Sequence, residues 1–129
     1  MKILYLYTEV MGYTLSTVKE LINLNYEVHI VNWDKNQQVP MKLKKIEGLT
    51  FYPRSEYNYK DIINLGKKIS PNMVVVSGWQ DLGYLPAAFY FNSKNIPVIA
   101  GFDDQWKGSI RQKIAALFSF IIRKFFSHA

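Results

Sequence analysis

Five short apolar runs alternate with segments of helical periodicity, and this alternation constrains the fold more than any other feature. The runs are KILYLY, EVHIVNW, GLTFY, MVVVS and IPVIAG, at residues 2–7, 27–33, 48–52, 73–77 and 96–101. Short apolar runs of this kind are typical of strands buried on both faces. Such strands, separated by helices, predict an open, doubly wound parallel sheet covered on both sides, which is a three-layered α/β domain.

Four helices are expected between and after these strands. Helical spacing of apolar residues places them at residues 14–25, 61–69 and 84–92 and from Ser109 onward. Thr17 and Glu20 have the spacing of a capping box for the first helix. Asn25 and Asn95 are suited to ending helices in place of glycine. The polar, lysine-rich residues 34–48 are expected to form a long loop, and no repeat or linker divides the chain into parts.

Length and composition exclude several classes of protein. The 129 residues suit one domain, and a hydrophobic fraction of 49% is sufficient for a core. The chain has no cysteine, which rules out disulfides and thiolate chemistry and fits a cytoplasmic location. The apolar stretch at residues 114–122 is far shorter than the roughly 20 residues that span a bilayer. Residues 1–7 are too short an apolar segment, followed too closely by Glu9, for a signal peptide.

Known cofactor motifs are missing. The loop after the first strand carries only Gly12, so the glycine-rich turn of nicotinamide-binding proteins is absent, and no phosphate-binding P-loop occurs. His29 and His128 are the only histidines, a poor basis for a metal site. We therefore expect neither a metal nor a resident cofactor. An alternative is a flavodoxin-like FMN carrier, with Thr8, Gly12 and Thr14 near phosphate, although Glu9 would repel it.

Ligands of doubly wound sheets bind outside the carboxyl ends of the strands. The loops expected there gather glycine, aromatic and acidic residues, which suit a sugar because rings stack on its C–H faces while carboxylates accept from its hydroxyls. The predicted binding residues are Gly12, Tyr13, Trp79, Asp81 and Trp106.

The segment GFDDQWKG at residues 101–108 adds two adjacent carboxylates to this edge. Asp103 and Asp104 point in different directions, so they are poorly placed to share one proton. One of them can cap the last helix, or one can bind or deprotonate a substrate hydroxyl, or neither has such a role. They are the candidate catalytic residues.

The order MKILYLYTEVMGYT, SGWQDLGY and PVIAGFDDQWKGSIRQK resembles the N-terminal half of a family 4 glycosyltransferase with the GT-B fold, over nearly the whole chain. The resemblance implies a Rossmann-like, acceptor-binding domain at residues 1–129 of a retaining, metal-independent enzyme. It implies that Gly12 and Tyr13 lie near the donor diphosphate and the acceptor, and that Trp79, Asp81, Asp103 and Asp104 lie on the acceptor side. The nucleotide-sugar donor would be bound mainly by a second domain that this sequence lacks. We therefore expect a truncated fragment that is inactive alone and whose complete form works on cell-surface polysaccharide or glycolipid.

The last predicted helix is basic and apolar. Residues 105–129 contain Lys107, Arg111, Lys113, Arg123 and Lys124 but no Asp or Glu, so they hold +5 of the net charge of +6. Apolar residues at helical spacing form a stripe along this helix, and this stripe is expected to pack on the sheet. The stripe consists of Ile110, Ile114, Leu117, Phe118, Ile121, Ile122 and Phe125, and Phe120 and Phe126 widen it. The alternative is that the helix contacts an anionic membrane surface through four basic residues: Arg111, Lys113, Arg123 and Lys124. The protein would then be a peripheral enzyme at the inner face of the membrane, or a non-catalytic interaction module there. Nucleic acid is not expected, since no binding motif accompanies the charge.

Overall fold

The computed structural model describes residues 1–35, 46–78, 80–101, 108–117 and 126. The elements follow in the order β1 (Lys2–Tyr7), α1 (Gly12–Asn23), β2 (Glu27–Asn32), β3 (Leu49–Pro53), the 3-10 turn η1 (Arg54–Glu56), α2 (Tyr59–Ile69), β4 (Met73–Val76), α3 (Tyr84–Ser93), β5 (Val98–Ala100) and α4 (Ile110–Leu117). The five predicted strands are confirmed within two residues at either end.

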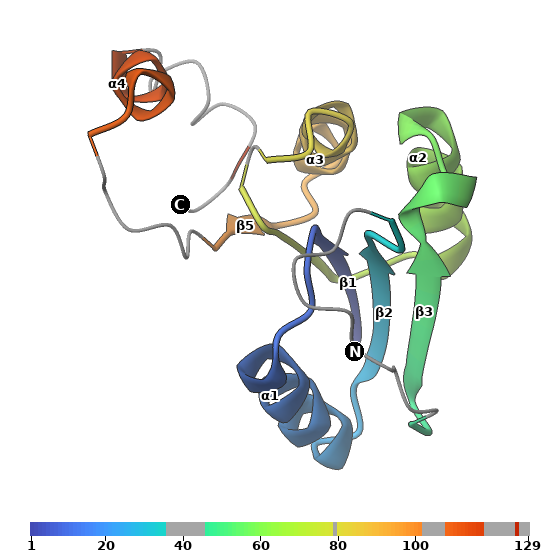
Figure 1. Ribbon diagram of the computed structural model, residues 1–129. Helices are drawn as coiled ribbons and strands as arrows, with labels where there is room; N and C mark the ends of the chain where they lie inside the picture. Colours follow the sequence, from blue (N-terminus) through green and yellow to red (C-terminus); the bar gives the residue numbers. More distant parts are fainter. Residues whose placement is uncertain (36–45, 79, 102–107, 118–125, 127–129) are drawn as a thin grey trace.

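The strands form one parallel sheet in the order β3-β2-β1-β4-β5 (Figure 1). The chain winds outward from β1 to one edge and then crosses to β4 and β5, which gives the Rossmann order. The predicted open, doubly wound α/β sheet is therefore confirmed. A flavodoxin-like sheet has the order 2-1-3-4-5, so the strand order does not support the FMN-carrier alternative.

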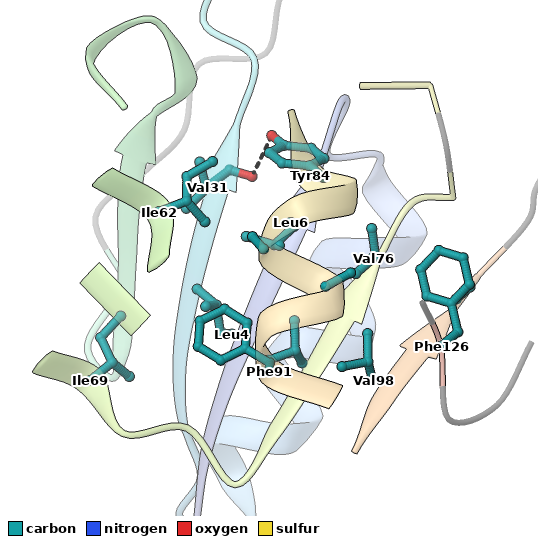
Figure 2. Close-up of a cluster of buried hydrophobic side chains, with 14 residues drawn as sticks. Leu4, Leu6, Val31, Ile62, Ile69, Val76, Tyr84, Phe91, Val98 and Phe126 are labelled. Carbon is teal, nitrogen blue, oxygen red and sulfur yellow. Dashed lines mark hydrogen bonds between the residues drawn. The ribbon is translucent and has the colours of Figure 1, made fainter. Parts of the chain in front are cut away.

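Helices cover both faces of the sheet, because successive side chains of each central strand point to opposite sides. Ile3 and Tyr5 of β1 pack on the face that carries α1. Leu4 and Leu6 point the other way, into the larger cluster under α2 and α3, where Phe91 fills the centre (Figures 1 and 2). The three predicted layers follow from strands that are apolar on both faces.

The helix ends are only partly as predicted. Asn25 and Asn95 adopt φ of 61° and 59°, the left-handed geometry expected after a helix. The proposed capping box at Thr17 is wrong, because α1 begins at Gly12 and the Thr17 hydroxyl instead donates to the carbonyl of Tyr13. The missed capping box is at α2, where the Asn58 side chain accepts from the amide of Asp61 and the Asp61 carboxylate accepts from the amide of Asn58.

The start of α4 corrects a second expectation. The Ser109 hydroxyl accepts from the amide of Gln112, and the Gln112 side chain accepts from the amide of Ser109. This reciprocal pair fills the cap that was considered for Asp103 or Asp104. Those two aspartates lie outside the described residues.

The apolar stripe of α4 is not packed on the sheet over its described part. The side chains of Ile110, Ile114 and Leu117 are 78%, 53% and 72% exposed. Figure 1 shows α4 standing apart from the sheet and from the other helices. Phe126 was expected to widen the apolar surface of this helix, and that expectation is wrong. Its side chain is only 5% exposed and packs beside Val98 in the main core (Figure 2).

Candidate functional site

The loops after β1, β2 and β4 are bonded to one another at the carboxyl edge of the sheet. The amide of Thr8 donates to the Ser77 hydroxyl at 3.1 Å, and the Thr8 hydroxyl donates to the Gln80 side chain at 2.9 Å. The amide of Trp33 donates to the Thr8 carbonyl at 3.2 Å. Thr8 is buried and thus joins three loops into one rim.

Tyr84 holds the same rim from the side of the hydrophobic core. Its single hydroxyl hydrogen is shared between the carbonyl of Tyr7 at 2.9 Å, where β1 ends, and the carbonyl of Val31 at 3.3 Å, near the end of β2; Figure 2 shows the bond to Val31. The ring is fully buried, and burial raises the pKa of the Tyr84 hydroxyl well above its ordinary value. Tyr84 is therefore a neutral structural donor at any physiological pH.

Asp81, a predicted binding residue, is the centre of a polar network on the rim. Its Oδ2 accepts from the indole nitrogen of Trp33 and from Nε of Arg54, both at 2.8 Å. Its Oδ1 accepts from Nη2 of Arg54 at 3.1 Å and from the amide of Gly83 at 2.8 Å. Four acceptor positions on one carboxylate are thus filled by donors of the protein itself.

The electrostatics of Asp81 follow from these bonds. Burial of the carboxylate alone raises its pKa, but the hydrogen bonds from Arg54, Trp33 and Gly83 outweigh burial and bring the pKa below its usual value. Asp81 is therefore ionised and acts as an anchor for Trp33 and Arg54. A direct contact between Asp81 and a ligand remains a prediction.

Arg54 is held on every side. Besides its paired bonds to Asp81, its Nη1 donates to the Tyr57 carbonyl, and its guanidinium carbon lies 5.4 Å from the centroid of the Tyr84 ring. A Cβ at Gly83 would lie 2.2 Å from Nη2 of Arg54, so only glycine permits this close approach. The guanidinium is consequently fixed in place before any ligand arrives.

A hollow of about 250 Å³ opens beside this network. Its lining residues come from the ends of β2 and β3 and from the loop after β4: Trp33, Asp34, Lys35, Arg54, Ser55 and Asp81. Asp34 accepts hydrogen bonds from the hydroxyl and the amide of Ser55, and these bonds lower the pKa of its carboxyl group. Trp33 and Arg54 were not among the predicted binding residues. The place of Trp33 directly after a strand was a usable signal, whereas the role of Arg54 depends on a tertiary contact.

Gly12 and Tyr13 form the first turn of α1, directly after the loop that follows β1, and their contact with a donor or an acceptor remains a prediction. The Tyr13 side chain is 59% exposed, and a Cβ at Gly12 would have nothing within 4 Å. Space is therefore open beside the backbone at this helix start, as a close approach of a ligand would require.

Several predicted residues fall elsewhere. Six of them lie outside the described residues: Trp79, Asp103, Asp104, Trp106, Arg123 and Lys124. Arg111 belongs to α4, with its side chain outside the described part, and Lys113 is exposed on the same helix. Within the described ranges, no group of three or more potential metal ligands occurs, and no helix is long and apolar enough to cross a bilayer.

Several solved structures share the fold of this chain. They include Bordetella bronchiseptica WbmH in complex with NAD⁺ (TM-score 0.56, 16% identity) and the UDP-glucose 4-epimerase of Thermus thermophilus with NAD (TM-score 0.55, 13% identity). Each match covers 77% of this chain but only 38% and 36% of the respective enzyme. Staphylococcus aureus homoserine dehydrogenase matches 97% of this chain and 30% of its own (TM-score 0.53, 13% identity). The TM-scores show a shared Rossmann-type fold and, at such low identity, nothing beyond the fold; the chain spans well under half of each enzyme.

No curated protein sequence matches the chain significantly. The sequence profile described as glycosyl transferase 4-like matches residues 2–121, from the start of β1 to beyond α4. With nearly all of its length matched in this way, the chain belongs to the glycosyl transferase 4-like family.

Proposed function

We propose that this chain is the acceptor-binding domain of a nucleotide-sugar-dependent hexosyltransferase of GT-B architecture, acting on cell-surface polysaccharide or glycolipid. The family match over residues 2–121 is the observation that carries the proposal. The donor is a co-substrate held mainly by a second domain, and neither a metal nor a resident cofactor takes part. The acceptor is a sugar or a lipid-linked sugar bound at the carboxyl edge of the sheet.

The rim supports this assignment chemically. The exposed ring of Tyr13 offers a stacking surface, and the open backbone at Gly12 allows a phosphate or sugar oxygen to approach the first turn of α1. Trp79 and Trp106 would add further rings. Asp104, or its neighbour Asp103, would accept the proton of the attacking acceptor hydroxyl or orient that hydroxyl, since both follow β5 in the sequence.

Gly12→Ala tests the site with little disturbance of the fold. Because the added methyl group meets nothing within 4 Å, the variant should unfold at an unchanged temperature. In the complete gene product, transfer from a panel of nucleotide sugars should fall about tenfold or more as the methyl group blocks the ligand. Wild-type transfer rates for Gly12→Ala would contradict this site, and no transfer from any donor by the unaltered protein would contradict the function.

Asp104→Asn in the same assay tests the catalytic assignment. Loss of the carboxylate should lower kcat by about 100-fold while the thermal unfolding temperature stays unchanged, since general acid–base groups typically contribute factors of this size. Asp103→Asn serves as the matched neighbour, and the larger effect identifies the residue that meets the acceptor. Equal and undiminished rates for both variants would exclude a catalytic role for the pair.

A specific observation also favours contact with an anionic membrane. α4 exposes Ile110, Ile114 and Leu117 together with Lys113, and no acidic residue occurs between residues 105 and 129. Apolar side chains beside cations, without acids, suit the interface of anionic lipids. We propose that α4, with Arg111, Arg123 and Lys124, docks the enzyme peripherally on such a surface.

Vesicle flotation measures this contact. The chain should float with vesicles that contain phosphatidylglycerol, should not float with pure phosphatidylcholine, and should be released by salt because the attraction is screened. Ile114→Asp, Lys113→Glu and Arg123→Gln combined with Lys124→Gln should each weaken flotation. Lys68→Gln on α2 is the control for general surface charge. Flotation that ignores lipid charge, or that survives all of these changes, would refute the proposal.

A further inference from the structure

The hollow beside Asp81 contains two carboxylates, and the protein itself fills four acceptor positions of Asp81 and two of Asp34. Asp81 accepts from Trp33, Gly83 and twice from Arg54. Asp34 accepts from both the hydroxyl and the amide of Ser55. Sugar hydroxyls, which would donate to free carboxylates, therefore find no open position on Asp81 and only the partly used carboxylate of Asp34.

The hydrogen-bond donors that line the hollow still have N–H groups available for a ligand. Arg54 commits three N–H groups, two to Asp81 and one to the carbonyl of Tyr57, and its remaining two N–H groups have no partner in the described part of the chain. Lys35 is exposed and lines the hollow, where its charge helps to lower the pKa of the neighbouring Asp34 carboxyl group while its N–H groups remain open to solvent. The charges of Lys35, Arg54, Asp34 and Asp81 cancel. Any preference for an anion therefore comes from these unused donors rather than from the net charge.

Arg54 is also prepared for such a role. Its guanidinium is held by Asp81 and Tyr57 and lies against the Tyr84 ring. Because the side chain is already ordered, binding an anion costs little further conformational entropy. An ionised acceptor on such a donor forms hydrogen bonds roughly twice as strong as a neutral one.

Trp33 supplies the apolar part of the hollow. Its indole N–H is bonded to Asp81, which fixes the ring beside Arg54. An aromatic ring in this setting can stack on the C–H face of a sugar. The volume of about 250 Å³ lies below the roughly 300–1,000 Å³ of pockets for drug-sized ligands, so the hollow suits a single sugar ring.

We infer that this hollow is a subsite for an acidic sugar unit of the acceptor. The anionic group, a carboxylate or a phosphate, accepts from Arg54 and Lys35, while the sugar ring stacks on Trp33. The inference rests on the proposed function and adds to it a class of acceptor: a glycan that carries uronic acid or phosphorylated sugar.

Titration of the 129-residue chain with small sugars tests the subsite, followed through the indole N–H resonance of Trp33 in NMR spectra, assigned with Trp33→Phe. Glucuronate or glucose 6-phosphate should shift this resonance at about tenfold lower concentration than glucose. The stronger of the two anions identifies the source of the negative charge. Lys35→Gln should weaken the binding of that anion several-fold, while Lys19→Gln, an exposed change on α1, should not.

Lys35→Gln is the preferred variant because Lys35 is exposed, whereas loss of Arg54 would also disturb Asp81. Equal binding of glucose and glucuronate would overturn the inference, as would inorganic phosphate binding as tightly as glucose 6-phosphate. Absence of any response to both acidic sugars would also overturn it. If one of these results is obtained but sugar transfer by the complete gene product is still lowered by Gly12→Ala, the subsite is refuted and the proposed function is retained.

Discussion

Asp81 was predicted as a binding residue, but in the structure its carboxylate holds two other side chains in place. Its carboxylate fixes the Trp33 indole and the Arg54 guanidinium, so its effect on a ligand passes through those two side chains. The prediction was made because Asp81 follows a buried strand, and the structure places it in the loop after β4. The side-chain donors to Asp81 come from residues 48 and 27 positions earlier in the chain, which no local pattern reveals.

Asp81→Asn should destabilise the fold in a pH-dependent way. The amide cannot replace the paired bond to Arg54, so the free energy of unfolding near neutral pH should fall by about 2–3 kcal/mol. The pKa of Asp81 is depressed in the folded state, so its contribution is complete above the unfolded pKa of about 3.9 and is lost as the pH falls through the folded value. Urea denaturation of both proteins from about pH 7 to about pH 3 should therefore show the two stabilities converging. A constant difference over that range would mean that the charge of Asp81 is not what stabilises the network.

At the scale of elements, strands and helices follow closely from apolar patterns, while their ends depend on particular side chains. The capping boxes Asn58–Asp61 and Ser109–Gln112 both have readable three-residue spacing. Thr17–Glu20 has the same spacing but lies inside α1, because the chain turns into a helix as early as Gly12. A spacing rule alone cannot choose among such pairs, since the start of the helix is set by how its apolar face meets the sheet.

Gly66 should be essential to the contact between α2 and α3. A Cβ at this position would lie 2.1 Å from the buried ring of Phe91, and that ring has no room to move in the core. Gly66→Ala should lower the free energy of unfolding by about 1–3 kcal/mol, although alanine is the better helix former. Gly12→Ala is the matched control and should be neutral or slightly stabilising, because its methyl group meets nothing. Equal stabilities of the two variants in chemical denaturation would contradict the packing of α2 on α3.

At the scale of the whole molecule, the last described segments divide between core and surface. Phe126 packs beside Val98 and joins the main core, whereas the apolar face of α4 remains exposed. A packed stripe on α4 was the more natural expectation, because most amphipathic helices cover a sheet. The stripe identifies a helix with an apolar face but carries no information about what that face contacts.

Phe126→Ala should therefore cost far more stability than its place near the end of the chain suggests. Removing a ring that is 5% exposed leaves a cavity beside Val98, with an expected loss of about 3–4 kcal/mol. Phe89→Ala removes a ring that is 53% exposed and should cost clearly less. Both are measured by urea denaturation monitored by circular dichroism. Similar losses in the two variants would mean that Phe126 does not close the core.

The sequence by itself determined the class of fold and the order of its elements. Apolar runs such as those of β1 and β4 favour burial of both strand faces, and hydrophobicity is a property that each side chain has by itself. Only the tertiary structure decided which strands are neighbours, that Arg54 reaches Asp81, and that α4 leaves its apolar face uncovered. Those outcomes depend on contacts between distant parts of the chain, whose geometry is fixed only when the whole sheet is assembled.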